Sequence, residues 1–426
     1  MVQVLPTRRS TKAAVSAVLG LSLLTLTACA SSTTRNPATA EGGGTLLRSR
    51  VAQAPPQDAT DLKAATAGLR KLGLTLSQNL DPDTGAGGNQ VFSPASLAIA
   101  FAMVREGSDD VTSREIDHVI GLPANRQAAY NRIVQALTDV GAGDTLEIND
   151  AFFVDPDLEV KQGYLDAIQK WYGAGVRQTA FPSPALDVIN GWVDGKTHGR
   201  IPKLLDQLDE NAVAALVNTI YLNAKWAEPF DKSETHDQAF TTGAGQAVTT
   251  KTMHQSTVLD YAAGDGWQAV RLPYAGGKLS MWVLLPKEGS RDPRDLLAPD
   301  VLTEAVDRAD PTDVDLSLPR WDTGTRADLT AMLQQRMPHV FEDGHLDRMS
   351  PDQWLTVSQV VQQANITVGE KWTEAAAATA VVMAETSAQL PTGLPFTADH
   401  PFAYAIVHDE TGVPLFEGVV SDPSAG

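Results

Sequence analysis

The spacing of apolar residues predicts helices in several parts of the chain. The first pattern has leucines three or four positions apart on one helical face, at Leu69, Leu72, Leu76 and Leu80. Gly73 lies inside this pattern and weakens it, because glycine lowers the stability of a helix. A second helix is expected to begin at Ser93-Pro94, since a serine followed by proline in the first turn is typical of helix starts. Residues 164–172 are amphipathic and predict a third helix.

Shorter apolar or alternating segments predict strands, most of them in the second half of the chain. Residues 269–272 and 279–285 are largely apolar and are separated by a Pro- and Gly-containing turn at 273–277. Residues 314–318 alternate between apolar and polar side chains, as a half-buried strand does. Further strands are expected at 355–367, 401–407 and 415–420. Helices and strands therefore occur together, which predicts an α+β fold.

Length and charge limit the classes of protein. The chain has 426 residues, no internal repeat and no convincing linker between residues 60 and 423, so we expect one large domain over 59–426. Its formal net charge is −19, with acidic residues spread along its whole length. This charge argues against nucleic acid and against an anionic membrane surface as electrostatic partners.

The first residues predict a secretion signal rather than a part of the fold. Residues 1–28 combine early basic residues with an apolar stretch that is too short to span a bilayer comfortably. They end at Leu26-Thr27-Ala28-Cys29, which resembles a bacterial lipobox. We expect cleavage before Cys29 and attachment of lipid to this residue, which would hold the protein on the outer face of the cell membrane. The alternative is an ordinary signal peptide that happens to carry a late cysteine.

The residues after the signal predict a flexible connection. Cys29 is the only cysteine of the chain, so no disulfide can form within it. Residues 29–58 are rich in Ser, Thr, Ala, Gly and Pro and have no apolar periodicity. We therefore expect a tether between the membrane and the domain.

The chain contains no motif of a catalytic or metal site. It lacks G-x-S-x-G, H-E-x-x-H, a phosphate-binding loop and a dinucleotide fingerprint. The eight histidines are scattered, and His400 and His408 are expected to serve packing or a loop contact. Residues 81–88 are acidic but lack the later ligands of a calcium loop, so they predict a surface turn. We expect neither an enzyme nor a metal or other cofactor, although a catalytic triad assembled in space stays open.

The segment that begins at Glu370 is the most informative part of the sequence. A charged entry leads through Trp372 into small, mostly uncharged residues that continue through Ala384. On composition alone an exposed helix is favoured, because alanine is the best helix former. Strands are expected on both sides, however, and residues 370–390 contain no proline, the first one after Glu370 being Pro391. The segment can therefore also become a strand of the same sheet system.

Five parts of the chain, in one order, resemble the serpin family of protease inhibitors. They are 91–103, 189–201, 216–230, 370–380, and the pair 398–402 with 414–418. They are similar to the family's helix B, the end of helix F, the strand and turn at the top of the main sheet, the hinge of the reactive-centre loop, and the C-terminal signature. The resemblance implies a monomer with a fold of about eight to nine helices around three β-sheets and an exposed reactive-centre loop.

The resemblance also implies a mechanism. The loop is offered to a serine or cysteine protease, which forms an acyl-enzyme at one peptide bond. The cleaved loop then inserts into the central sheet as a new strand and traps the protease by distorting it. Insertion would begin at the hinge, which comprises Glu370, Trp372, Thr373, Glu374, Ala375, Ala376, Ala377 and Ala378. Counted alternately from Thr373 to Met383, the side chains of one face are uncharged, as burial in a sheet requires.

Trp372 departs from the family pattern. Inhibitory members usually have glycine at this place, which eases the bend at the start of insertion. The alternation directs the Trp372 side chain outward, so we expect it to slow insertion more than to prevent it.

Other residues match the positions that control insertion in the family. Ser93, Ser96 and Asn218 match the shutter under the inserting strand. Gln362 stands where many members have histidine, and it can still donate and accept hydrogen bonds. Trp226 matches the aromatic residue of the breach, where insertion begins. Simple core packing is the alternative for all of these residues.

The resemblance limits the reactive bond to a few positions. The family's usual spacing from Glu370 leads to Thr386-Ser387, whereas counting back from Phe402 ends near Leu390, because this loop is longer than average. Proline follows Leu390 and disfavours cleavage there. We therefore prefer Thr386-Ser387, with Met383-Ala384 as the next candidate.

The loop composition also favours certain targets. No Arg or Lys lies between Thr373 and His400, so we expect elastase-like or subtilisin-like proteases rather than trypsin-like ones. The alternative function is that of a non-inhibitory serpin, a surface-tethered binding or chaperone-like protein. The small hinge residues favour inhibition, and Trp372 favours the alternative.

Overall fold

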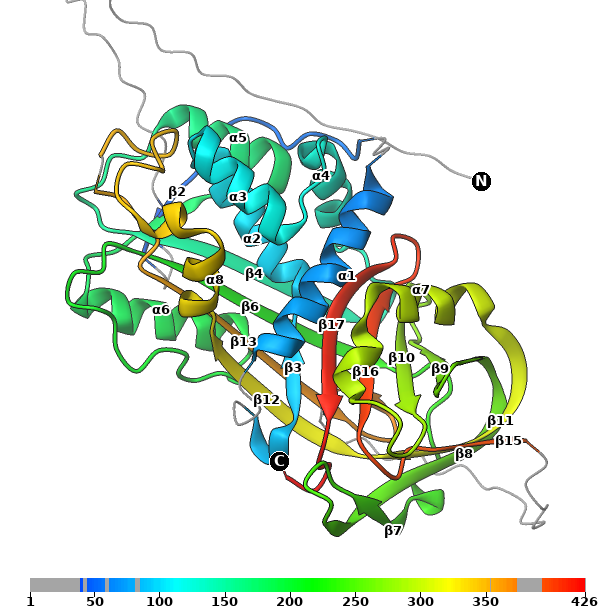
Figure 1. The fold of residues 1–426 in the computed structure, drawn as a ribbon. Helices are drawn as coiled ribbons and strands as arrows, with labels where there is room; N and C mark the ends of the chain where they lie inside the picture. Colours follow the sequence, from blue (N-terminus) through cyan, green and yellow to red (C-terminus); the bar gives the residue numbers. More distant parts are fainter. Residues whose placement is uncertain are drawn as a thin grey trace, which may run out of the picture. The chain divides into compact units, whose positions relative to one another are not determined.

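A single folded unit within residues 36–426 contains all the elements of the structure. The computed structural model describes residues 39–40, 44–57, 61–80, 85–352, 354–373 and 393–425. Helices and strands occur together along this unit, which confirms the expected α+β fold (Figure 1).

Eight α-helices occur in the described residues, which agrees with the expected number. They are α1 Leu62–Asn79, α2 Pro94–Gly107, α3 Asp110–Ile120, α4 Arg126–Ala136, α5 Gln162–Tyr172, α6 Ser183–Lys196, α7 Pro299–Arg308 and α8 Thr330–Arg336, with short 3-10 turns η2 Ala86–Gly88, η3 Lys232–Glu234, η4 Pro293–Leu297 and η5 Pro338–Phe341. The expected start of α2 is confirmed, because the Ser93 side chain accepts a hydrogen bond from Ser96 N at 3.2 Å. Among the described residues, a helix with both the length and the apolar character of a bilayer span does not occur.

The first sheet has eight strands. In spatial order they are β1 Thr39–Ala40, β2 Thr45–Leu47, β5 Val176–Gln178, β4 Thr145–Val154, β6 Ala214–Lys225, β14 Trp372–Thr373, β13 Gln359–Val368 and β12 Trp321–Asp328. Most neighbours are antiparallel, but β4 pairs in parallel with β5, and β6 and β13 pair in parallel over part of their length.

The second sheet has nine strands. In spatial order they are β15 Leu394–Thr397, β11 Asp310–Pro319, β8 Ala247–Gly264, β9 Trp267–Pro273, β10 Leu279–Pro286, β16 Phe402–His408, β17 Val413–Val420 and β3 Gln90–Phe92, with β7 His236–Thr241 beside β8. Counted by hydrogen bonds, the described strands thus form two sheets where three were expected. The reason is β8, which is 18 residues long and pairs in succession with β7, β11 and β9, so that it joins groups of strands that would otherwise be separate.

Helices cover both faces of the first sheet around β6. Every residue of α2 from Pro94 to Val104 is buried, and this helix contacts β4 and β6 on one side and β17 of the second sheet on the other (Figure 1). On the opposite face, Ile189 and Trp192 of α6 pack in a separate cluster with Val217 of β6. The middle of the first sheet is therefore a dry environment in which every backbone group needs a partner.

Residues 44–57 lie against the domain, which differs from the expected tether through residue 58. Strand β2 pairs with β5, and Ser49 Oγ donates to Asp166 Oδ1 at 2.5 Å. Farther along, Ala54 N donates to Lys170 O at 2.8 Å. Backbone groups, short polar side chains and Leu47, which packs against the core, make these contacts, and a single leucine gives no apolar periodicity.

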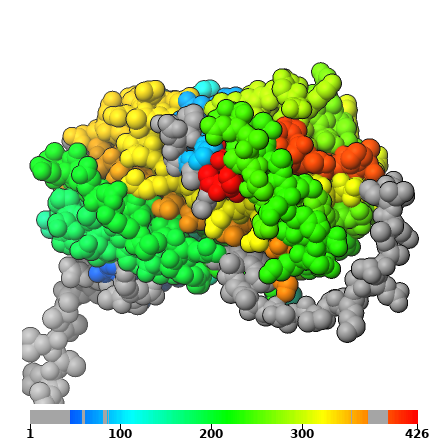
Figure 2. All heavy atoms as spheres, turned by 90° about the horizontal axis from the view of Figure 1, so that it is seen from below, coloured from blue at the N-terminus to red at the C-terminus, as the bar shows by residue number. Residues whose placement is uncertain are grey.

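The C-terminal end of the chain reaches the surface beside the loop after β7. Gly243 N donates to Ser421 O at 2.9 Å, and Asn89 Nδ2 donates to Asp422 O at 2.7 Å. Figure 2 shows this end in red between the green segment that holds β7 and the blue and yellow segments that hold β3 and β12. The C-terminal residues are therefore held both by the loop after β7 and by the residue before β3.

Candidate functional site

Strands β6 and β13 diverge toward one end of the first sheet, and β14 lies between them there. The parallel pairing of β6 and β13 runs from Ala215↔Gln359 to Ile220↔Ala364. Beyond it the chain reverses after Val368, and Thr373 pairs antiparallel with Val368 of β13 and with Ala224 of β6. Trp372 and Thr373, the first two residues of the expected inserting strand, therefore already lie between β6 and β13 at the end where these strands diverge.

A gap separates β14 from the paired part of β6 and β13. Residues 222–223 and 365–367 pair on their outer sides with β4 and β12, and the strand pairings of the described residues do not extend to their facing edges. A pocket at this place is lined by Ile220, Tyr221, Leu222, Asn365, Ile366 and Thr367, together with Thr197, Arg200 and Ile201 from the segment after α6. Within the part of the chain that the structure describes, the two edges thus face each other as neighbours of a further strand would.

Four of the residues expected at the shutter lie together where β6, β13 and α2 meet. Gln362 Oε1 accepts from Ser93 N at 2.9 Å, and its Nε2 donates to Ser93 O at 3.0 Å. The same Nε2 donates to Asn218 Oδ1 at 2.8 Å, and Asn218 Nδ2 donates to Ser96 Oγ. All four residues are buried. Side chains from three elements thus form one hydrogen-bonded cluster.

Asp150 of β4 belongs to this cluster, and the sequence reasoning missed it. Its Oδ1 accepts from Asn218 Nδ2 and lies 3.4 Å from the Ser96 hydroxyl. Desolvation raises the pKa of Asp150 to about 7, against the hydrogen bonds from Asn218 and Ser96, which lower it. The signal available in the sequence was a carboxylate directly before the apolar run 151–154, inside a segment that becomes one strand.

Trp226, expected at the breach, lies beside the hinge. Its Nε1 donates to Gly369 O at 2.8 Å, and its backbone N donates to Lys371 O at 3.2 Å. The indole stacks on Tyr274, with ring centroids 4.7 Å apart and an interplanar angle of 13°, and Phe230 meets it edge-on at 6.5 Å. The buried aromatic ring is therefore in direct contact with the turn from which β14 starts.

Glu370 is held from several sides at the same turn. Its backbone O accepts from Phe230 N at 2.8 Å, and its Oε1 accepts from Thr235 Oγ1 at 3.1 Å. Arg320 Nη1 lies 3.6 Å from the same carboxylate oxygen. These contacts fix the start of the hinge to the segment between β6 and β7 and to the residue before β12.

Several expected site residues lie outside the described residues. They are Cys29, Glu374, Ala375, Ala376, Ala377, Ala378, Met383, Ala384, Thr386 and Ser387. For Trp372 and Thr373 the structure describes the backbone pairing alone. The roles expected for all these residues stay predictions.

Comparisons with known proteins identify a family. A profile described as "Serpin (serine protease inhibitor)" matches residues 67–423. A serpin-like protein of Methanosarcina acetivorans is 30% identical over 360 residues, which span 82% of this chain and 85% of that protein. Serpin-ZXA of Oryza sativa subsp. japonica is 31% identical over 395 residues, which span 86% of this chain and 99% of that protein.

Solved structures show the same architecture. The crystal structure of tengpin, a thermophilic serpin, in the native state is similar with a TM-score of 0.78 at 24% identity, covering 87% of this chain and 97% of tengpin. Human thyroxine-binding globulin in complex with its hormone is similar with a TM-score of 0.76 at 25% identity, covering 86% of this chain and 100% of the globulin.

Proposed function

The chain belongs to the serpin family, a family of serine protease inhibitors, and from this premise we propose that it inhibits its target as a suicide substrate. The protease attacks one peptide bond between β14 and β15, and an acyl-enzyme forms. The N-terminal part of the cleaved segment then inserts between β6 and β13 and carries the bound protease with it. Distortion of the protease before deacylation keeps the complex trapped.

The position of β14 is the observation that carries this proposal. Its two residues lie between β6 and β13 and run antiparallel to both. A segment that continues in the same direction meets the facing edges of residues 222–223 and 365–367 next. Insertion would thus lengthen an existing pairing, which avoids the cost of starting a new one.

Full insertion also requires β6 and β13 to separate where they are now paired, over residues 215–220 and 359–364. The new strand would replace each lost hydrogen bond and add a second set, since it has a partner on both sides. Its inward side chains, counted alternately from Thr373, carry no charge. The state before cleavage is therefore metastable in this proposal, and cleavage of the loop removes the barrier.

The shutter cluster supports a gating role. Gln362 on β13 and Asn218 on β6 are joined by a hydrogen bond at 2.8 Å, across the line along which the strands would separate. Ser93, at the start of α2, holds Gln362 by its backbone. Opening the sheet would break the bond to Asn218, so the cluster acts as a latch in addition to its part in the core.

We also propose the finer features that the sequence predicts. The preferred reactive bond is Thr386-Ser387, and Met383-Ala384 is the next candidate. The proposed targets are elastase-like or subtilisin-like serine proteases, because the loop offers small and medium side chains without Arg or Lys. The protein acts as a monomer in this proposal.

A lipid anchor would place the inhibitor outside the cell. Cleavage before Cys29 and acylation of that residue would hold the protein on the outer face of a bacterial membrane. The mature chain would then guard the surface against secreted proteases. Metabolic labelling with a fatty acid, with Cys29→Ser as the comparison, tests this proposal directly.

The second candidate function is a non-inhibitory serpin that binds a ligand or partner at the cell surface. Two observations favour it: Trp372 replaces the usual hinge glycine, and the similar thyroxine-binding globulin holds a hormone. Loop cleavage would then proceed without a trapped protease.

Incubation with pancreatic elastase and with subtilisin tests the inhibitory function. The protein should begin near residue 36, because residues 44–57 pack on the domain. We expect a covalent complex on a denaturing gel and a released C-terminal peptide that starts at Ser387. Cleavage without a complex, and without a rise in thermal stability, would move the assignment to the second function.

Two arginine variants locate the reactive bond. Thr386→Arg and Met383→Arg each offer trypsin a cleavage site that the loop otherwise lacks. We expect trypsin to be trapped by Thr386→Arg and only to cleave Met383→Arg. The reverse result would move the reactive bond to Met383-Ala384 and leave the mechanism intact.

A further inference from the structure

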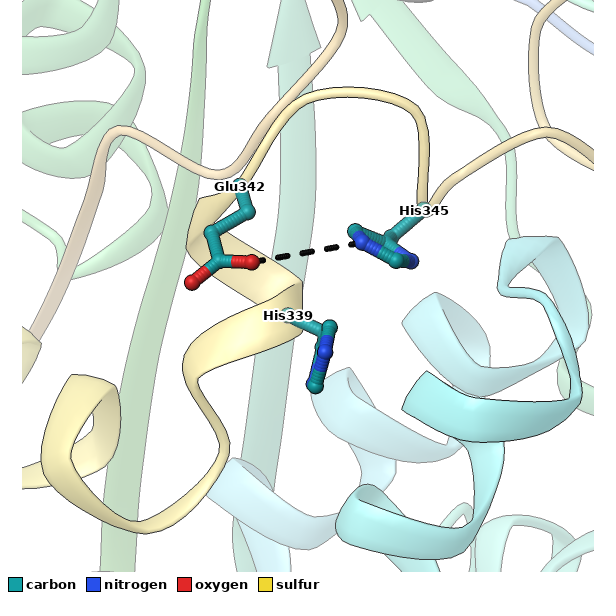
Figure 3. A group of neighbouring side chains, drawn as sticks. All are labelled: His339, Glu342 and His345. Atoms are coloured by element: carbon teal, nitrogen blue, oxygen red, sulfur yellow. Dashed lines mark ion pairs between the residues drawn. The ribbon is translucent and has the colours of Figure 1, made fainter.

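Two histidines and a glutamate converge on the segment after α8. His339 lies in η5, and Glu342 and His345 follow it; the Glu342 carboxylate and the His345 ring face each other, and the His339 ring lies beside them (Figure 3). One ligand atom from each of the three residues lies within 4.8 Å of the others. The two imidazole rings meet edge to face with centroids 4.5 Å apart, and His345 Nε2 is 4.0 Å from Glu342 Oε2.

Two further carboxylates orient the histidines by contacting the Nδ1 atom of each ring. Glu115 of α3 lies 2.5 Å from His339 Nδ1, and Asp109, which caps α3, lies 2.8 Å from His345 Nδ1. A carboxylate at Nδ1 fixes the proton there and leaves Nε2 as the free electron-pair donor. Histidines that bind metal are regularly held in this way by a second carboxylate.

The geometry points to a site for one divalent transition-metal ion of the zinc class, held by the free ring nitrogens of His339 and His345 and by the carboxylate of Glu342. Two imidazoles and one carboxylate are donors that zinc accepts, whereas calcium and magnesium prefer oxygen donors throughout. Three protein ligands leave the fourth tetrahedral position to water.

The three side chains are near the required positions and are able to close on an ion. Ligand atoms of a tetrahedral zinc site are about 3.4 Å apart, as metal–nitrogen distances of about 2.0–2.1 Å imply. The side chain of Glu342 is 56% exposed and has room to rotate inward, while those of His339 and His345 are 31% and 26% exposed. The two histidines are thus held in place by their neighbours, and the Glu342 side chain can rotate to become the third ligand.

A bound ion would link η5 to the turn that follows it, at the start of a long irregular segment. The segment from Glu342 to β13 contains neither a helix nor a strand in its described residues. It is attached to the end of α2 by Arg348 N and Met349 N, which donate to Gly107 O at 3.0 and 2.9 Å. The metal would add a cross-link before β13, the strand that borders the proposed insertion site.

Zinc binding by the purified full chain tests the proposal. Equilibrium dialysis against Zn²⁺ should show one ion bound in excess of that bound by His339→Ala/His345→Ala. Co²⁺ in place of Zn²⁺ should give the visible absorption of a tetrahedral site in the unchanged chain only. Cys29 is present in both proteins, so binding at that thiol does not contribute to the difference.

Two further variants separate loss of the site from loss of folding. Glu342→Ala removes an exposed ligand with little risk to the fold, and we expect at least tenfold weaker zinc binding with unchanged circular dichroism. His118→Ala/His236→Ala removes two exposed histidines outside the site and should bind zinc as the unchanged chain does. Zinc should raise the unfolding temperature of this control but not that of Glu342→Ala. Equal binding by the unchanged chain and by His339→Ala/His345→Ala would overturn the proposal.

Discussion

Gln362 binds the backbone of Ser93 from two directions. Its Oε1 accepts from Ser93 N at 2.9 Å, and its Nε2 donates to Ser93 O at 3.0 Å. Ser93 is the residue that caps α2, so the middle of β13 is fixed to the start of the central helix. The bond from the same Nε2 to Asn218 extends the connection to β6. One amide thus holds together the three elements that would move relative to one another in the proposed insertion.

Gln362→Ala is expected to destabilise the protein by about 2–4 kcal/mol, because it leaves buried groups of Ser93 and Asn218 without partners. The midpoint of urea unfolding measures this loss. Gln359→Ala is the matched control on the same strand, since the Gln359 side chain donates to Asp328 at the surface, at 3.0 Å. The control should lose about 1 kcal/mol or less. Equal losses in the two variants would show that the cluster has no special part in stability.

Asp150 predicts a pH dependence of stability. Desolvation raises the pKa of Asp150 to about 7 in the folded protein, while the unfolded value is near 3.8. Between these values the folded protein binds the extra proton, so its free energy of unfolding is highest at low pH and falls as pH rises from about 4 to about 7. The residue is partly exposed to solvent, which screens the effect, so we expect a loss of about 1–2 kcal/mol over this range.

Asp150→Asn should flatten that part of the pH profile and raise stability at pH 8 relative to the unchanged chain. Denaturant unfolding at a series of pH values measures both effects. Glu147→Gln serves as the control, because it removes a carboxylate of the same strand that lies outside the cluster, beside His198. A profile that is the same for Asp150→Asn and the unchanged chain would contradict the raised pKa.

Local patterns were sufficient to predict much of the fold. The Ser93 cap, the leucine face of α1 and the strands β16 and β17 each depend on spacing within a few residues, and the structure has them at the expected places. The predicted helix at 164–172 and strand at 314–318 also lie within α5 and β11. Patterns of this kind can be recognised in a single sequence because residues that are close in the chain belong to the same helix or strand.

Contacts between distant parts of the chain could not be predicted in the same way. Asp150 joins the shutter cluster only because β4 pairs with β6, and the segment around Ser49 packs by backbone and polar contacts and a single leucine, which leave no apolar period. His339 and Glu115 are 224 positions apart and meet through the packing of η5 on α3. Such relations depend on tertiary structure, so the sequence alone showed only scattered polar residues.

The reason for Gly73 in α1 lies on another strand. A Cβ at Gly73 would stand 1.7 Å from Oε2 of Glu417, a fully buried residue of β17. Burial raises the pKa of Glu417 well above its usual range, against the opposing charge of Arg70. The helix therefore needs glycine here because the carboxyl group occupies the space of a side chain.

Gly73→Ala is expected to destabilise the protein by about 2–3 kcal/mol through this overlap, although Gly→Ala in a helix usually stabilises by about 1 kcal/mol. In a Glu417→Ala background the same change should be neutral or stabilising. Thermal unfolding of the four proteins of this cycle gives the coupling energy. Gly191→Ala in α6, where a Cβ would meet nothing within 4 Å, is the control and should be stabilising. Additive effects of the two changes would refute the overlap.

Ala375→Pro should convert the inhibitor into a substrate. Proline removes a backbone N–H that the inserted strand needs on one of its two sides, and its ring restricts the extension of the strand beyond Thr373. We expect the protease to cleave the same bond at a similar rate, while the covalent complex and the rise in unfolding temperature after cleavage are both lost. Gln389→Pro is the matched control, because it lies after either candidate bond and does not enter the sheet; it should still trap the protease. A stable complex with Ala375→Pro would show that trapping does not depend on insertion of this segment, and the mechanism would then have to rest on another part of the loop.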